Sequence, residues 1–134
     1  MSRVSRHEGA RIRSPSPSKL SNIVFLGYVS DGEVKALMKN CAAFVFPSYY
    51  EGFGIPPLEA LSTGAKIIVS DSASLPEIYG DTAAYINPYN TDCSLLELSE
   101  KTVSKEAVER VLKKYTYRNA AERLYEILVQ YGEE

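Results

Sequence analysis

Short apolar runs alternate with amphipathic stretches along the chain from Asn22 onward. Each run ends at a Gly, a Pro or a polar residue, which is typical of a strand buried in a sheet. Four such runs predict strands at residues 23–26, 42–46, 66–69 and 83–86.

The stretches between these runs carry apolar residues at helical spacing. One helix is predicted to begin at Asp31, which we assign as its N-cap. A second begins at Pro56 and Pro57, which suit a first helical turn, and ends at Gly64. A turn opens at residues 75–77. The C-terminal third is predicted to be helical, with two apolar faces: Val108, Val111, Leu112 and Tyr115, then Ala121, Leu124, Tyr125 and Leu128. Strands that alternate with helices predict an α/β protein with about four parallel strands and flanking helices.

The composition is that of a single ordinary domain. The 134 residues include 15 Lys and Arg against 17 Asp and Glu, so no overall basic field favours nucleic acid. The longest stretch without a charged residue is residues 40–50, far short of the roughly 20 residues that a membrane-spanning helix needs. We therefore expect neither a nucleic-acid partner nor a transmembrane segment. Cys41 and Cys93 predict two reduced, largely buried thiols in a cytoplasmic protein.

Residues 1–20 differ from the rest of the chain. Five basic residues stand against one acidic residue, around an S-P-S-P-S run with almost no apolar residues. Such a segment cannot bury enough surface to fold, so we predict an extended leader before a folded domain at 21–134. Arg- and Ser-rich leaders also resemble organellar transit peptides, and a disordered tail or a gene-boundary artefact is the alternative. The sole histidine, His7, lies here, and its neighbours argue against a catalytic or zinc-binding role.

The loop after the predicted strand 42–46 is the first candidate for chemistry. Ligands of parallel sheets sit outside the carboxyl ends of the strands. Gly52 and Gly54 flank Phe53 and would let the backbone approach a ligand closely. The next helix, from Ile55, would direct its N-terminal N–H groups to the same place, where a phosphate or a sugar hydroxyl fits.

Glu51 and Glu59 complete this candidate site. A carboxylate accepts hydrogen bonds from two hydroxyls at once, which suits the vicinal diol of a ribose or hexose. The alternative is that Glu59 only complements the helix dipole and that Glu51 is solvated. We expect both carboxylates to face one concave surface while Leu58 and Leu61 turn into the core.

The run F-P-S-Y-Y-E-G-F-G-I-P-P-L-E-A at residues 46–60 resembles the E-x7-E signature of the retaining nucleotide-sugar glycosyltransferases of family 4. The flanking runs N-I-V-F-L-G-Y-V, T-G-A-K-I-I-V-S-D and S-L-P-E-I-Y-G-D-T-A-A-Y-I-N-P are similar to that family too. The resemblance covers residues 22 to about 90 closely and the C-terminal helices loosely. It implies a partial Rossmann-like domain, the C-terminal donor-binding domain of the GT-B fold.

The resemblance also implies roles for individual residues. Glu51 would be the catalytic residue, which holds donor-sugar hydroxyls and helps to stabilise developing charge. Glu59 would bind the ribose diol, and Glu77 would be structural. No metal or cofactor is implied, since helix dipoles and basic side chains stabilise the leaving diphosphate in this fold. The other donor-binding residues would be Gly52, Phe53, Gly54 and Ile55 at the sugar and diphosphate, with Tyr28 and Val29 at the nucleobase.

The implied function is transfer of a hexose from a nucleotide-diphospho-sugar to an unidentified acceptor, with retention. The family also has an N-terminal acceptor domain and two further strand–helix units before residue 23, the first with the Arg and Lys that neutralise the diphosphate. We therefore expect the isolated chain to be inactive without a separate N-terminal acceptor-binding domain or chain. A longer cytoplasmic enzyme could also associate with a membrane surface. The alternatives are a non-catalytic nucleotide-sugar-binding or partner-docking module, or a gene remnant.

The strand order of this fold, 3-2-1-4-5-6, would place the absent strands between residues 23–26 and 42–46. These two strands would then either pair directly or leave exposed edges, which would allow self-association.

Overall fold

The computed structural model describes residues 22–90 and 92–132 of the chain. The leader at residues 1–20 and His7 lie outside these residues. In chain order the elements are α1 (Asp31–Asn40), β1 (Phe44–Phe46), α2 (Ile55–Ser62), β2 (Ile67–Ser70), α3 (Leu75–Tyr79), the 3-10 helix η2 (Gly80–Thr82), β3 (Ala83–Ile86), α4 (Leu95–Ser99), α5 (Lys105–Lys114) and α6 (Tyr117–Tyr131).

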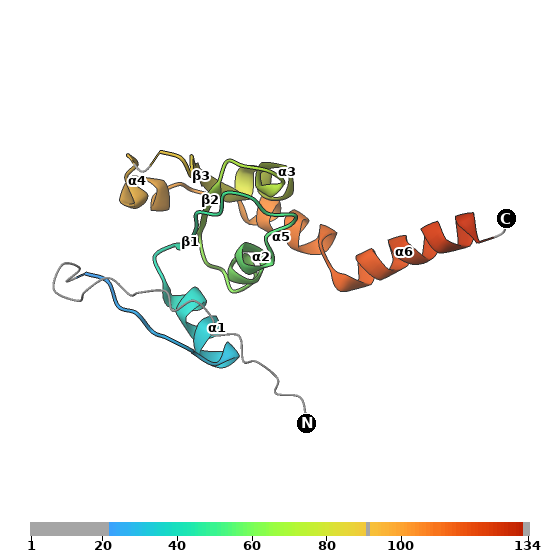
Figure 1. Cartoon of the computed structure of the whole chain (residues 1–134), viewed down its shortest axis with the longest axis horizontal. Coiled ribbons are helices and arrows are strands. Elements are labelled where there is room, and N and C mark those ends of the chain that lie inside the picture. Colours follow the sequence, from blue (N-terminus) through green and yellow to red (C-terminus); the bar gives the residue numbers. More distant parts are fainter. Residues whose placement is uncertain (1–21, 91, 133–134) are drawn as a thin grey trace, which may run out of the picture.

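The sheet has three parallel strands in the order β1-β2-β3 (Figure 1). Val69 of β2 pairs with Phe46 on one side and with Tyr85 on the other. All four residues of the central strand are buried, as expected for a strand covered on both faces. The predicted α/β class with a parallel sheet is confirmed.

Alternation along β2 divides the core into two parts. Ile67 and Val69 face the larger part, with residues of α2, α3 and α5 such as Leu61, Leu75 and Val111. Ile68 faces the smaller part, with Ala84 and Ile86 of β3 and Leu98 of α4. A loop connects the C-terminal end of β1 to α2, and another connects the C-terminal end of β2 to α3.

The predicted strand at residues 23–26 does not form. The segment is extended but pairs with no strand among the described residues, and it leads into α1 away from the sheet (Figure 1). Its side chains are exposed, from 52% at Ile23 to 80% at Val24. The prediction failed because an apolar run becomes a strand only beside a neighbouring strand, and no described strand flanks β1 on its outer side.

The N-cap of the first helix lies one residue earlier than predicted. Ser30, not Asp31, is the N-cap of α1, and it forms a capping box with Glu33. The Glu33 carboxylate accepts hydrogen bonds from the backbone N–H of Ser30 at 2.8 Å and from its hydroxyl at 2.7 Å. These hydrogen bonds hold the pKa of Glu33 below its usual value. Met38 is the buried residue of α1 and anchors it to the core.

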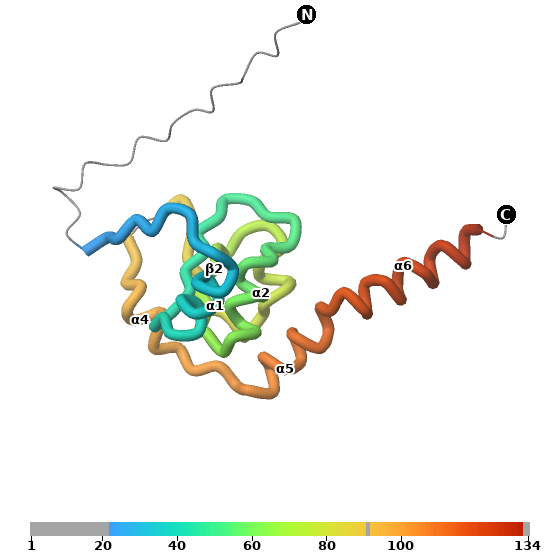
Figure 2. Tube along the Cα trace, turned by 90° about the horizontal axis from the view of Figure 1, so that it is seen from below, coloured from blue at the N-terminus to red at the C-terminus, as the bar shows by residue number. Residues whose placement is uncertain are grey.

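The C-terminal third is helical, as predicted, but its helices α5 and α6 differ in environment. Val108, Val111, Leu112 and Tyr115 pack against the larger core, whereas no residue of α6 is buried. Figures 1 and 2 both show α6 extending away from the rest of the domain. Asn119 donates hydrogen bonds to the backbone oxygens of Lys113 and Lys114 at the end of α5.

Two further expectations have definite outcomes. Cys41 and Cys93 are free thiols, but both are exposed rather than buried as predicted. Each lies just outside a regular element, where the core does not reach. No helix in the described part of the chain is long and apolar enough to cross a membrane.

Candidate functional site

The loop of residues 47–54 runs from the C-terminal end of β1 to the N-terminus of α2, as predicted. Pro47 follows the strand directly, and Glu51 lies half-buried in the loop. The Ser48 hydroxyl donates to Glu51 Oε1 at 3.0 Å and lies 3.2 Å from the backbone oxygen of Tyr50. The Glu51 side chain is therefore oriented by its own loop before any ligand binds.

Gly54 is required by the geometry of this loop. It is the N-cap of α2, and its φ of 77° is in the left-handed region that favours glycine. A Cβ at this position would lie 2.6 Å from Leu75 Cδ2. Gly52 differs, because it is exposed, its φ is not positive, and an added Cβ would meet open space. Of the two glycines, only Gly54 is needed for the backbone conformation.

The N-terminus of α2 offers fewer hydrogen-bond donors than the sequence analysis assumed. Pro56 and Pro57 lie in its first turn and have no N–H groups. The first-turn amide that can serve a ligand is that of Ile55, whose side chain is 49% exposed. The α2 dipole still favours an anion here, but most of the backbone donors for a phosphate are missing.

The loop is fastened to α3 and α5. The Ser74 hydroxyl donates to the backbone oxygen of Glu51 at 2.9 Å, and the fully buried Tyr79 hydroxyl donates to the backbone oxygen of Gly54. Burial raises the pKa of Tyr79, and a hydrogen bond with the Leu58 backbone partly opposes that shift. Phe53 packs edge-on against Tyr115, the C-cap residue of α5, with ring centroids 5.1 Å apart.

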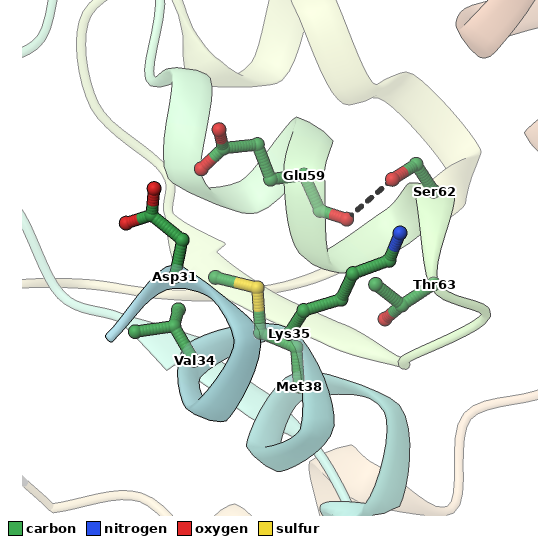
Figure 3. Close-up of a pocket in the computed structure, with 7 residues that line it drawn as sticks. All are labelled: Asp31, Val34, Lys35, Met38, Glu59, Ser62 and Thr63. Carbon is green, nitrogen blue, oxygen red and sulfur yellow. Dashed lines mark hydrogen bonds between the residues drawn. The ribbon is translucent and has the colours of Figure 1, made fainter. Parts of the chain in front are cut away.

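Glu59 lies on the exposed side of α2 and lines a groove between α1 and α2, about 340 Å³ in volume (Figure 3). Asp31, Lys35 and Met38 line the groove from α1, and Ser62 and Thr63 line it with Glu59. In Figure 3 the Asp31 and Glu59 carboxylates lie toward the same end, and the Lys35 ammonium extends toward Ser62. The groove thus combines acceptors, a cation and two hydroxyls.

A second cavity of about 520 Å³ lies on the other side of Glu59, between α2, α5 and the start of α6. It is mainly apolar, lined among others by Phe53, Ile55, Leu58 and Leu112. Glu51 lines neither of the cavities that Glu59 lines. The convergence of the two glutamates on one surface therefore stays a prediction. Leu61 is buried and Leu58 packs against the core, as expected.

Tyr28 and Val29 lie in the segment before α1. Tyr28 is 98% exposed and Val29 is half-buried, and neither lines either of these cavities. Lys35 in the groove, and Ser74 and Tyr79 behind the loop, were not predicted as site residues. The sequence signal for the last two is their position in the S-L-P-E-I-Y run, one of the runs that flank the E-x7-E motif. No group of His, Cys, Asp or Glu in the part of the chain that the structure describes could hold a metal ion.

A parallel sheet with a glycine-containing loop between a strand end and a helix N-terminus defines a Rossmann-like α/β domain. The family described as "Glycosyl transferases group 1" matches residues 18–119. The chain therefore belongs to this glycosyltransferase family. Membership of this family makes it a transferase by resemblance.

Curated relatives include the serotype-specific mannosyltransferase WbdA of Escherichia coli, which is 40% identical over 101 residues. That match covers 75% of this chain and 12% of the relative. The O-antigen chain mannosyltransferase B of E. coli is 44% identical over 70 residues, which are 52% of this chain and 18% of that protein. The MMP alpha-(1->4)-mannosyltransferase of Mycolicibacterium hassiacum is 36% identical over 67 residues, 48% of this chain and 16% of the relative. The chain spans less than a fifth of each of these proteins. No solved structure matches the chain significantly.

Proposed function

We propose that this chain is the donor-binding part of a retaining family 4 glycosyltransferase with the GT-B fold. It would transfer a hexose from a nucleotide-diphospho-sugar to an acceptor hydroxyl. The family match over residues 18–119 carries this proposal, and the Glu51 loop at the end of β1 supports it. The names of the relatives make mannose the first sugar to test.

The proposed reaction breaks the bond between the anomeric carbon and the diphosphate oxygen. A bond forms from that carbon to an acceptor oxygen, the diphosphate leaves with the electron pair, and the hydroxyl proton is released. Glu51 would hold the sugar and stabilise charge as the bond loosens. The backbone of Gly52, Phe53 and Gly54 would contact the sugar and diphosphate.

The nucleoside would lie nearer to α1 and α2 than the sugar and the diphosphate do. Glu59 would bind the ribose diol, since its carboxylate is exposed in the groove beside α1. Tyr28 and Val29, which precede α1, would contact the base, and Ile55 would lie beside the diphosphate. We propose that the reaction needs neither a metal nor another cofactor. A separate N-terminal part would bind the acceptor, and the two parts together would form a cytoplasmic enzyme.

Calorimetric titration of the chain with GDP-mannose, UDP-glucose and the free nucleoside diphosphates tests donor binding. We expect one nucleotide sugar to bind, and Glu59→Gln to weaken its binding by about tenfold through loss of a charged hydrogen bond. Glu106→Gln is the matched control, because Glu106 is an exposed helical glutamate on α5 outside the groove. Failure of every nucleotide sugar to bind at millimolar concentration would refute the proposal.

Transfer requires a second experiment. We expect the isolated chain to transfer no sugar, and co-expression with the N-terminal half of a related enzyme to restore transfer. In that complex Glu51→Gln should lower turnover more than nucleotide affinity. Transfer by the purified chain above a Glu51→Gln control would contradict the expected inactivity.

A non-catalytic nucleotide-sugar-binding module is the second candidate. The observation that favours it is that Glu51 lines neither of the two cavities that Glu59 lines. Donor binding without transfer in the reconstituted complex would select this function.

A further inference from the structure

The four-residue segment 51–54 is held at both of its ends by hydroxyl groups from outside the loop. Ser74 Oγ donates to the backbone oxygen of Glu51 at its start, and Tyr79 Oη donates to the backbone oxygen of Gly54 at its end. Both donors belong to α3 or to its N-cap. One short helix and its N-cap therefore hold both ends of the segment that carries Glu51.

Few other polar contacts restrain this segment. Within the described chain, no backbone hydrogen bond outside the regular elements is donated or accepted by residues 48–54. The bond from the Leu58 amide to the Gly54 oxygen that would open α2 is not among them. The Tyr79 hydroxyl replaces this bond, because it donates to the Gly54 oxygen and also forms a hydrogen bond with the Leu58 backbone.

The two hydroxyls are themselves rigidly placed. Tyr79 and Leu75 are both fully buried, and Ser74 is half-buried at the start of the same helix. Leu75 Cδ2 lies so close to Gly54 that a Cβ there would be 2.6 Å away. A close-packed contact of this kind transmits the position of α3 directly to the loop.

We propose that Ser74 and Tyr79 are positioning residues of the donor site, whose hydroxyls set where Glu51 and the 52–54 backbone meet the donor sugar. This inference rests on the proposed function for its ligand. It assigns α3 to the site, although Glu77 and its L-P-E-x-x-G-D run were expected to be mainly structural. The residues would touch no substrate and would act through the two loop carbonyls.

The test combines four variants of the whole chain. Ser74→Ala and Tyr79→Phe each remove one hydroxyl that reaches the loop. Tyr85→Phe is the matched tyrosine control, since its hydroxyl donates to the Gly80 oxygen instead of to the loop. Ser74→Thr restores a hydroxyl and serves as the conservative rescue of Ser74→Ala.

The first readout is the backbone order parameter of residues 51–54 from nitrogen-15 NMR relaxation. We expect it to fall from about 0.85 in the wild type to below about 0.6 in Ser74→Ala and Tyr79→Phe. Tyr85→Phe and Ser74→Thr should keep the wild-type value. Unchanged order parameters in both test variants would overturn the proposal.

The second readout is affinity for the nucleotide sugar compared with the free nucleoside diphosphate. We expect Ser74→Ala to weaken nucleotide-sugar binding by about fivefold and nucleoside diphosphate binding by less, because only the nucleotide sugar also contacts Glu51. Equal losses for both ligands would show a general structural effect and contradict a positioning role. If the wild type binds no nucleotide sugar, the proposed function fails, and the order parameters alone decide whether the hydroxyls hold the loop.

Discussion

Leu75 occupies the space that a side chain at Gly54 would need. A Cβ at Gly54 would lie 2.6 Å from Leu75 Cδ2, and Leu75 is fully buried. The positive φ of Gly54 adds a second obstacle, because L-residues avoid that region. We expect Gly54→Ala to lower the free energy of unfolding by about 2–5 kcal/mol, measured by urea denaturation.

Gly64→Ala is the matched control for this prediction. Gly64 also has a positive φ, of 88°, but an added Cβ would meet open space. Its substitution should cost about 1–2 kcal/mol, the conformational part alone. Equal costs at the two positions would show that Leu75 moves aside without penalty.

Alkaline titration should reveal two tyrosines, Tyr79 and Tyr85, whose hydroxyls lose their protons late. Burial raises the pKa of Tyr85 to about 12, with the negative charge of Asp81 adding to the shift, and burial raises the pKa of Tyr79 further. Their contribution to stability is therefore present in full below pH 10, the ordinary tyrosine value, and is lost as the pH rises through the raised values. We expect tyrosinate absorbance to show a late phase that Tyr79→Phe reduces. Absence of a late phase that depends on Tyr79 would contradict this expectation.

The capping box of α1 should make the helix sensitive to acid. The backbone N–H and the hydroxyl of Ser30 hold the pKa of Glu33 below 4.5, so the folded state favours the carboxylate. This stabilisation is present above pH 4.5 and is lost as the pH falls through the lowered value. Carbon-13 NMR titration of the Glu33 carboxyl should show the low pKa in the wild type and a rise in Ser30→Ala. The same pKa in both proteins would contradict the capping box.

Most of α6 should be dispensable for the stability of the domain. None of its residues is buried, and Asn119 near its start makes the hydrogen bonds that end α5. A chain that ends at Ala121 should unfold within about 0.5 kcal/mol of the full chain, the usual range for surface changes. Asn119→Ala should cost more, because it removes the contacts to the α5 carbonyls. A large loss on truncation would mean that α6 packs against the domain in solution.

The sequence predicted the central elements well because their signals are local. The runs predicted at residues 66–69 and 83–86 correspond to Ile67–Ser70 and Ala83–Ile86, each an apolar run between polar boundaries. Residues 23–26 carry the same signal, but a strand also needs a partner, and that information is not in the run itself. The loop of Glu51 was predicted from its position after the strand at residues 42–46 and from its two glycines.

The contacts behind the loop could not be predicted in this way. Ser74 lies 23 residues from Glu51 in sequence, and Tyr79 lies 25 residues from Gly54. Only the crossover from β1 through α2 and β2 to α3 brings these groups together. The shortage of N–H donors at the start of α2 could be predicted from Pro56 and Pro57, because proline has no backbone N–H group.

The outer edge of β1 is poorly suited to pairing with a strand of another molecule. The strand is three residues long, and Pro47 follows it directly. A foreign strand could therefore form few ladder hydrogen bonds before it met a residue without an N–H group. Short edge strands and edge prolines are devices by which natural sheets avoid uncontrolled growth. A chain with an open sheet edge can thus stay dispersed at concentrations at which a longer edge would nucleate fibrils.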